Sequence, residues 1–285
     1  MQLPQTQDVS AKTGDLRLNE KAQTVKSQIK LNKVTTRSGG LGSAMAGLLL
    51  LGIAATSALG QVLPPSSLPY GLSYQEWSAK WWQWSLGQSR DSLELVGGPG
   101  VCDGPASRVR FLAGAYGFGV NAETNHVSIP AGTPLFLTVL GFEADNTACP
   151  TNTFTSLTAN QLTAEALSGW SGAASLTTCT IDGVEVAGIA DPTNSVYNVV
   201  SPAFSYTTAE RANILSLIAG EDCIPGGMTI YPTVADGVYL MLSPLSPGKH
   251  TIHWVGVAGP LSAPIVEDNV TFDITVLREP DRFGQ

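Results

Sequence analysis

Apolar and polar residues alternate over much of the second half of the chain, as expected of strands with one buried face. The clearest case is V-T-F-D-I-T-V-L, which places four apolar residues on one face: Val270, Phe272, Ile274 and Val276. Runs rich in β-branched and aromatic residues, bounded by Gly, Pro or Asp, predict strands at Arg108–Tyr116, Pro134–Phe142, Val196–Val200, Val238–Leu245, Lys249–Val255 and Val270–Leu277. Between two further strand-like runs, Asp182-Gly183 predicts a tight hairpin turn.

The segment Y-Q-E-W-S-A-K-W-W-Q-W, residues 74–84, has helical periodicity instead. Ser73 and Glu76 are spaced as a capping box at its start. At ~100° per residue, four rings share one narrow arc, the aromatic face: Tyr74, Trp77, Trp81 and Trp84. We expect this face to cover an open sheet face, with Trp82 on the flank of the arc and more exposed.

The strand pattern has no regular alternation with helices, which indicates a mainly β fold. We expect an antiparallel β-sandwich, immunoglobulin-like or jelly-roll, with the aromatic helix at the start of the mature chain. Two short inserted helices are expected at Ala159–Leu167 and Ala209–Ala219, the second with Thr207 and Glu210 spaced as a capping box. Residues 61–69 are interpreted as a Pro/Ser linker and residues 70–285 as a single domain.

Residues 1–60 are interpreted as a polar extension followed by a signal peptide. The apolar run Ala44–Ala55 is about a dozen residues long, whereas a membrane-spanning helix needs ~20. Basic residues precede this run and small residues follow it, which is the layout of a secretory signal. Cleavage is expected after Gly60, or alternatively after Ala58, and an uncleaved anchor is the other possibility. The protein is thus expected to be secreted, periplasmic or at the cell surface.

The distribution of charged residues along the chain limits the classes of molecule that it is expected to bind. The first 60 residues hold seven of the 15 Lys and Arg residues but only three of the 23 Asp and Glu residues, so the remainder is strongly acidic. This charge argues against nucleic acid as a partner. Motifs of the G-x-S-x-G, H-E-x-x-H and P-loop types are absent from the sequence, and we expect no cofactor and no metal.

An even number of cysteines follows the leader: Cys102, Cys149, Cys179 and Cys223. In an exported chain this predicts two disulfides, with three possible connectivities. The run Leu176–Cys179 is also similar to the T-L-x-T-C strand end of sortases, exported cysteine transpeptidases that need a thiolate, a His and an Arg. His126 and Arg211 supply the residue types, although a cysteine in a disulfide cannot act as a nucleophile.

Four blocks of the sequence resemble a group of uncharacterised exported bacterial proteins. These blocks are Y-G-L-S-Y-Q-E-W-S-A-K-W-W-Q-W, V-R-F-L-A-G, S-P-A-F and A-D-G-V-Y-L-M-L-S-P-L-S-P-G-K-H-T-I-H-W. The resemblance covers most of residues 70–276 and implies one exported domain, without an activity or a ligand to transfer. The late block is also similar to the corner that precedes a late strand of immunoglobulin-like sandwiches, with His250 in the place of the corner tyrosine.

Other candidate residues are scattered. His250 and His253 are an odd number of positions apart on a predicted strand, so they should face opposite sides of the sheet. The acidic run Glu267–Asn269 is expected in a solvated loop, where calcium binding is the alternative. Three carboxylates could form an acid/base pair in space, although no linear motif singles them out: Glu123, Glu143 and Asp145.

We therefore expect the protein to act by binding a ligand. The leading hypothesis is a non-enzymatic surface or glycan-binding module, with Trp82 and Tyr70 as candidate ligand-binding rings. The alternative is an exported hydrolase or cysteine transpeptidase whose site is assembled from distant residues.

Export yields a first testable prediction. The mature chain should begin at Gln61 or Leu59, because the apolar run is too short to anchor the protein stably in a membrane. N-terminal sequencing of secreted material checks this, and recovery of intact Met1 would show that the segment is an uncleaved tether.

Overall fold

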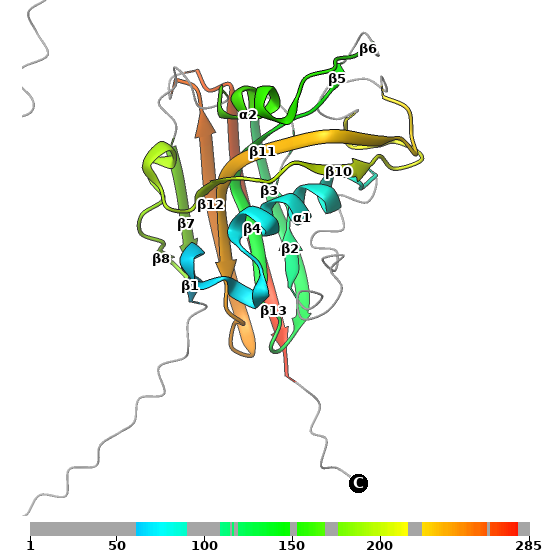
Figure 1. Ribbon diagram of the computed structural model, residues 1–285. Helices are drawn as coiled ribbons and strands as arrows, with labels where there is room; N and C mark the ends of the chain where they lie inside the picture. Colours follow the sequence, from blue (N-terminus) through cyan, green and yellow to red (C-terminus); the bar gives the residue numbers. More distant parts are fainter. Residues whose placement is uncertain are drawn as a thin grey trace, which may run out of the picture. The chain divides into compact units, whose positions relative to one another are not determined.

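The computed structural model describes residues 61–89, 109–114, 116, 119–148, 153–168, 176–215, 224–260 and 263–278, all within one compact unit. These residues form a mainly β fold with two large mixed sheets and two α-helices (Figure 1). The helices are α1 (Tyr74–Leu86) and α2 (Ala159–Ser168). The signal peptide expected within residues 1–60 lies outside the described residues.

The first sheet is centred on two long strands, β4 (Leu135–Ala144) and β11 (Thr229–Leu242). One edge of β11 pairs with β4, and its other edge is covered in succession by β1 (Val62–Leu63), β9 (Asn198–Val200) and β10 (Phe204–Thr207). The far edge of β4 pairs in parallel with the short strand β2 (Arg110–Leu112). Residues 61–69 were expected to be a linker, but Val62 and Leu63 extend the sheet.

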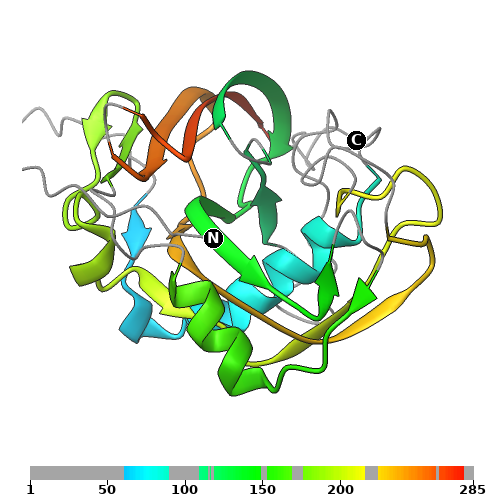
Figure 2. The same ribbon diagram turned by 90° about the horizontal axis from the view of Figure 1, so that it is seen from above.

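The second sheet packs face to face with the first. Its strand order is β3 (Gly119–Pro130), β13 (Val266–Leu277), β12 (Gly248–Ala258), β7 (Leu176–Ile181) and β8 (Val184–Glu185). The pair of β3 and β13 is parallel, so the sandwich is mixed, not purely antiparallel. Seen from above, β3, β12 and β13 lie together on the side away from α2 (Figure 2). A separate small ribbon joins β5 (Thr147–Ala148) to β6 (Thr153–Phe154).

The first sheet is buried on both faces. One face meets the second sheet in a core that includes Leu137, Leu240, Trp254 and Phe272, while Phe136, Tyr239 and Met241 pack in another cluster with α1. The near-continuous apolar runs of β4 and β11 fit this position, since a strand covered on both sides need not alternate. The structure therefore has three layers: α1, the first sheet and the second sheet.

Helix α1 begins as predicted, with Ser73 and Glu76 forming a complete capping box. Its aromatic face is buried, as predicted: Tyr74, Trp77, Trp81 and Trp84. Trp77 packs edge-to-face on Phe111, and its indole N–H donates to the Pro69 carbonyl over 2.8 Å. The aromatic face thus covers the outer face of the first sheet.

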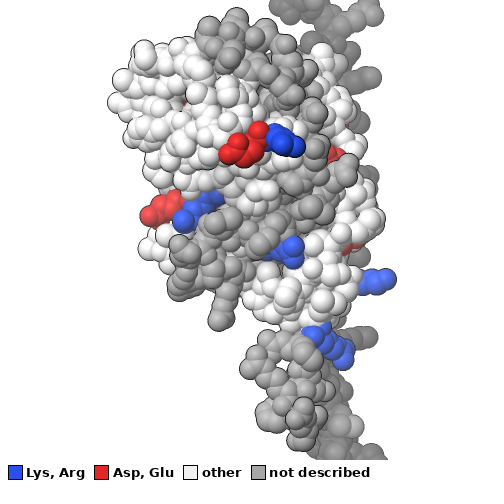
Figure 3. All heavy atoms as spheres, turned by 90° about the vertical axis from the view of Figure 1, so that its right-hand side faces the viewer, with Lys and Arg blue, Asp and Glu red and all other residues white. Residues whose placement is uncertain are grey.

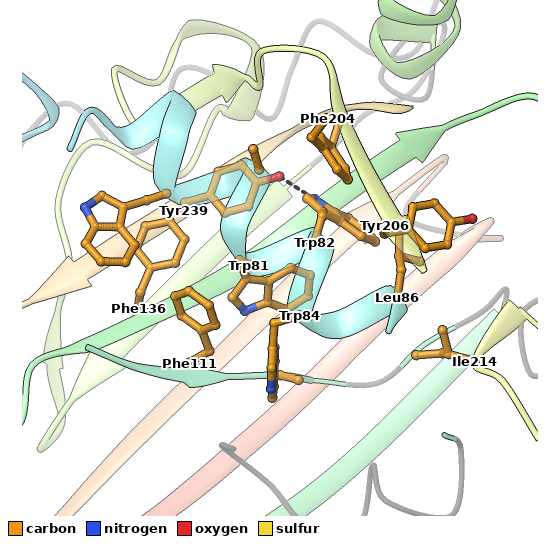
Figure 4. Packing of buried hydrophobic residues seen from close by; sticks show 14 of the residues in the cluster. Trp81, Trp82, Trp84, Leu86, Phe111, Phe136, Phe204, Tyr206, Ile214 and Tyr239 are labelled. Carbon is orange, nitrogen blue, oxygen red and sulfur yellow. Dashed lines mark hydrogen bonds between the residues drawn. The ribbon is translucent and has the colours of Figure 1, made fainter. Parts of the chain in front are cut away.

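The expectation that Trp82 is exposed is wrong. Only 7% of its surface is accessible, and its indole N–H donates to the Tyr239 hydroxyl over 2.7 Å (Figure 4). Space for the ring comes from Gly141, where an added Cβ would lie 3.3 Å from the ring, and Gly141 is paired across the sheet with Gly237. Helical periodicity places Trp82 on the flank, but it does not reveal that β11 lies close enough to cover that flank.

The hairpin turn and the two histidines of β12 lie as the sequence predicts. Asp182 and Gly183 both have positive φ, at 51° and 78°, and form the predicted hairpin turn between β7 and β8. His250 is buried and His253 lies on the opposite face of β12, as predicted. The His250 Nε2 is 2.8 Å from the Ser246 carbonyl oxygen, a bond to upstream backbone like that of a corner tyrosine.

The two inserted helices differ in outcome. Helix α2 confirms the first one, at Ala159–Ser168. Thr207, however, ends strand β10 and hydrogen-bonds Thr229, so it does not cap a helix. Residues 209–213 are not helical, and the rest of the expected segment lies largely outside the described residues. The spacing of Thr207 and Glu210 therefore arises by chance within a strand and the loop after it.

Cys179 also differs from expectation. Its side chain is buried between the two sheets with a free thiol, not a disulfide. Strand alternation in β7 turns this residue inward, where apolar neighbours surround it. Cys102, Cys149 and Cys223 lie outside the described residues, so pairing among them stays a prediction.

The packing of α1 yields a stability prediction. Trp77→Ala should lower the free energy of unfolding by about 3–5 kcal/mol, because it removes a fully buried ring and leaves a cavity against Phe111. Chemical denaturation of this variant beside Gln75→Ala, an exposed position on the same helix, measures the difference. Similar small losses in both variants would contradict the packing described for α1.

Candidate functional site

A pocket of about 160 Å³ lies where α1, β4 and the second sheet meet. Five aromatic side chains from α1, the segment after β2, β4 and β12 line it: Trp81, Trp82, Tyr116, Phe142 and Trp254. Three polar side chains also line it: Thr138, Glu143 and Asp268. The pocket is a mostly apolar concavity with a few polar groups, which is typical of small-ligand sites.

The pocket lies beside an edge of β4 that β2 leaves uncovered. Strand β2 pairs with β4 only over Leu135–Leu137, while β4 continues to Ala144. Strand β4 has a bulge at Val139. Leu140 pairs with Val238 and Thr138 pairs with the next residue of β11, Tyr239, so Val139 is the extra residue between two consecutive partners. The bulge changes which side chains of β4 point to each face of the sheet. In the described part of the chain, no strand pairs with this edge of β4 beyond Leu137, and the pocket lies there.

The polar atoms of three of these aromatic side chains are bonded to other protein groups. The Trp81 indole N–H donates to the Leu112 carbonyl over 3.0 Å, and the Trp82 N–H is held by Tyr239. The Tyr116 hydroxyl is 2.7 Å from the Ser85 hydroxyl. Trp81 and Trp82 stand nearly perpendicular, at 83°, and Trp81 is stacked with Tyr116 at a centroid distance of 6.5 Å.

Asp268 is a carboxyl group on the core-facing side of β13. It is in phase with Val266 and Val270, both buried, and the Asn121 amide on β3 donates to it over 3.3 Å. Burial raises the pKa of Asp268 to about 7, and the nearby Glu123 acts in the same direction. Near neutral pH this group therefore changes between its neutral and its charged form.

Glu143 is the second unusual carboxyl group. Its Oε1 is shielded from solvent and has no hydrogen-bond partner among the described residues. Burial raises the pKa of Glu143 well above its ordinary value, and the adjacent Asp145 adds to the shift. Asp145 itself accepts hydrogen bonds from Tyr206 and from the backbone and hydroxyl of Thr147. Its neighbours thus favour an uncharged, protonated Glu143.

Thr138 completes the polar lining. It is 8% exposed, and its hydroxyl has no hydrogen-bond partner within the described residues. A buried hydroxyl without a partner destabilises a fold by about 1–3 kcal/mol.

Of the two candidate ligand-binding rings, the pocket contains Trp82, together with Trp81 from the aromatic face. Tyr70 is half-buried against the aromatic cluster around α1 and is not among the residues that line the pocket. Sequence reasoning named Glu143 only as one of three scattered carboxylates and missed Thr138. Asp268 was expected in a loop but belongs to β13, and its phase with Val270 was the signal that could have identified it.

The residues of the cysteine-transpeptidase hypothesis do not converge. Burial raises the pKa of the Cys179 thiol to about 12, so the thiolate is disfavoured at neutral pH. His126 is exposed on β3, where its Nδ1 lies 3.3 Å from Asp273, and Arg211 is also exposed. The structure therefore does not assemble a nucleophilic cysteine site around Cys179.

The described residues contain no cluster of three or more His, Cys, Asp or Glu side chains able to hold a metal ion. No helix in this part of the chain has the length and apolarity needed to cross a membrane. On the face shown in Figure 3, the coloured charges are few and dispersed, and both signs are present. Within the described residues, the pocket is accordingly the best-defined candidate site.

Comparison with protein-family models, curated proteins and solved structures finds no match for this chain.

The raised pKa of Asp268 predicts how stability depends on pH. Between about pH 4 and 7 the folded protein retains a proton that the unfolded chain has released, so this group lowers the free energy of unfolding as pH rises. Asp268→Asn removes that effect. Its melting temperature relative to the parent should therefore increase between pH 4 and 8.

Glu267→Gln is the matched control, since it changes the neighbouring residue on the opposite face of β13. Its melting temperature should keep a constant offset from the parent. A constant offset for Asp268→Asn as well would contradict the placement of its carboxyl group in a desolvated site.

Proposed function

We propose that this protein is an exported binding protein that takes a small ligand into the pocket between α1, β4 and the second sheet. The observation that carries the proposal is the combination of aromatic walls with three polar groups whose placement is unfavourable without a ligand: Thr138, Glu143 and Asp268. Export is supported by the signal-like segment before residue 61, and the sequence charge argues against nucleic acid as the ligand.

Binding is favoured over catalysis by the nature of the polar groups. Activated hydroxyl and thiol nucleophiles lie within hydrogen-bond reach of a base. The Thr138 hydroxyl instead has no hydrogen-bond partner among the residues that the structure describes, and Cys179 is enclosed in the core with a raised thiol pKa. Neither group has the surroundings of an activated nucleophile.

An exported hydrolase is the second candidate, and one observation favours it. Glu143 and Asp145 form a carboxyl pair in which the pKa of Glu143 is raised, as for a general acid. Turnover of glycoside or ester probes that is lost in Glu143→Gln would support this alternative over a pure binding protein.

Substitutions at Thr138 test the binding proposal. Thr138→Val keeps the shape of the side chain and removes the unpartnered hydroxyl, so it should raise the melting temperature. Thr138→Leu adds bulk at the pocket wall and should abolish binding while the protein stays folded. The probes are glucose, N-acetylglucosamine, tetramethylammonium and phenol, followed by tryptophan fluorescence and saturation-transfer NMR.

The outcome separates specific from adventitious binding. At least one probe should bind the parent and fail to bind Thr138→Leu. Binding that persists in Thr138→Leu would place the interaction elsewhere on the molecule, and no binding by any probe would contradict the proposed function.

A further inference from the structure

We propose that the pocket recognises a compact organic cation, an alkylated ammonium group held by the aromatic rings and by Asp268. This inference rests on the proposed function, because it names the ligand class of the same pocket. Three observations support it: the arrangement of the aromatic rings, the carboxyl groups that line the pocket, and the volume of the pocket.

The rings form several walls of an aromatic cage. Trp81 and Trp82 are nearly perpendicular, with centroids 5.0 Å apart, and Tyr116 and Trp254 contribute from other elements. Because the indole N–H groups of Trp81 and Trp82 are bonded to other partners, these rings offer apolar faces and π electrons. Such cages bind quaternary ammonium groups through cation–π attraction.

The polar lining favours positive charge. Glu143 and Asp268 are the ionisable side chains other than Tyr116 among the described lining residues, and no Lys, Arg or His lines the pocket there. An anionic ligand would meet these carboxyl groups without a compensating cation. A cationic ligand would instead stabilise the charged form of Asp268, which burial disfavours.

Size separates the cation from a sugar. The pocket volume of about 160 Å³ is close to that of a cavity that accommodates benzene, ~150 Å³, and therefore about six heavy atoms. A trimethylammonium group is of this size, whereas a pyranose with its hydroxyl groups has about twice as many heavy atoms. A trimethylammonium group therefore matches the volume of the pocket more closely than a whole pyranose does.

Binding should depend on pH through Asp268. The groups that face it are Asn121 and Glu123 on β3 and the Tyr116 hydroxyl. The hydrogen bond from Asn121 lowers the pKa of Asp268 and the charge of Glu123 raises it, while Tyr116 interacts with Asp268 electrostatically. A cation binds the charged form of Asp268, whose pKa is about 7 in the free protein. Affinity should therefore fall about tenfold between pH 8 and pH 6 if this group alone titrates.

The test is a calorimetric titration at constant ionic strength with tetramethylammonium, choline and 3,3-dimethyl-1-butanol, the neutral carbon isostere of choline. Choline should bind at least tenfold more tightly than its isostere at pH 8, and its affinity should decrease at pH 6. In Asp268→Asn this preference should become several-fold smaller, because only the aromatic rings remain to favour the cation, and the pH dependence should be lost. Glu267→Gln, on the opposite face of the strand, should bind choline like the parent.

The titration distinguishes failure of the cation assignment from failure of the proposed binding function. Binding of the neutral isostere or of glucose without binding of the ammonium compounds would overturn the cation assignment and leave the pocket as a binding site. No binding by any of these compounds would count against the proposed function as well.

A last experiment, with lipid vesicles, distinguishes a lipid headgroup from a soluble ammonium compound as the ligand. Vesicles of phosphatidylcholine that bind with the same dependence on Asp268 would support a lipid headgroup as the ligand. Binding of free choline but not of vesicles would support a soluble ammonium compound. Vesicle binding that is unchanged in Asp268→Asn would contradict recognition through this pocket.

Discussion

The packing of α1 against the outer face of the first sheet is the interaction on which the other features depend. Strands β4 and β11 are apolar on both faces, so without α1 the side that carries Phe136 and Tyr239 would be exposed to water. The Tyr74 hydroxyl also connects three elements, because it donates to the Leu63 carbonyl and accepts from the Met241 amide. It thereby ties β1 and α1 to β11, and α1 in turn supplies two aromatic walls of the pocket.

The packing of α1 stabilises the fold, whereas the polar groups in the pocket are placed unfavourably for stability. Asp268 is half-buried on the core-facing side of β13, where burial raises its pKa, and Thr138 and Glu143 each leave a buried polar atom without a partner among the described residues. Polar groups placed unfavourably for folding are expected at functional sites, where a ligand compensates them. Three such groups lie together in the pocket beside the uncovered edge of β4, among aromatic side chains, which is why we assign a ligand site there.

Much of this fold follows from local patterns in the sequence. The capping box, the aromatic face, the Asp182-Gly183 turn and the alternation around Phe272 each report a local constraint, and all four are confirmed. Contacts between distant segments are not visible in this way. The burial of Trp82 depends on Gly141 and Gly237, and the parallel pairings of β2 and β3 have no local signature. The pocket was missed for the same reason, since its walls come from five separate segments.

Hydrogen exchange of the indole N–H groups tests the three-layer arrangement most directly. Trp77, Trp81 and Trp82 each donate an indole hydrogen bond in a buried setting, to the Pro69 carbonyl, the Leu112 carbonyl and the Tyr239 hydroxyl, respectively. If α1 is integral to the core, these protons should exchange as slowly as the most protected amides of β12 and β13, through global unfolding. Rapid exchange of the indole protons, while the strand amides stay protected, would show that α1 detaches independently and would contradict the account.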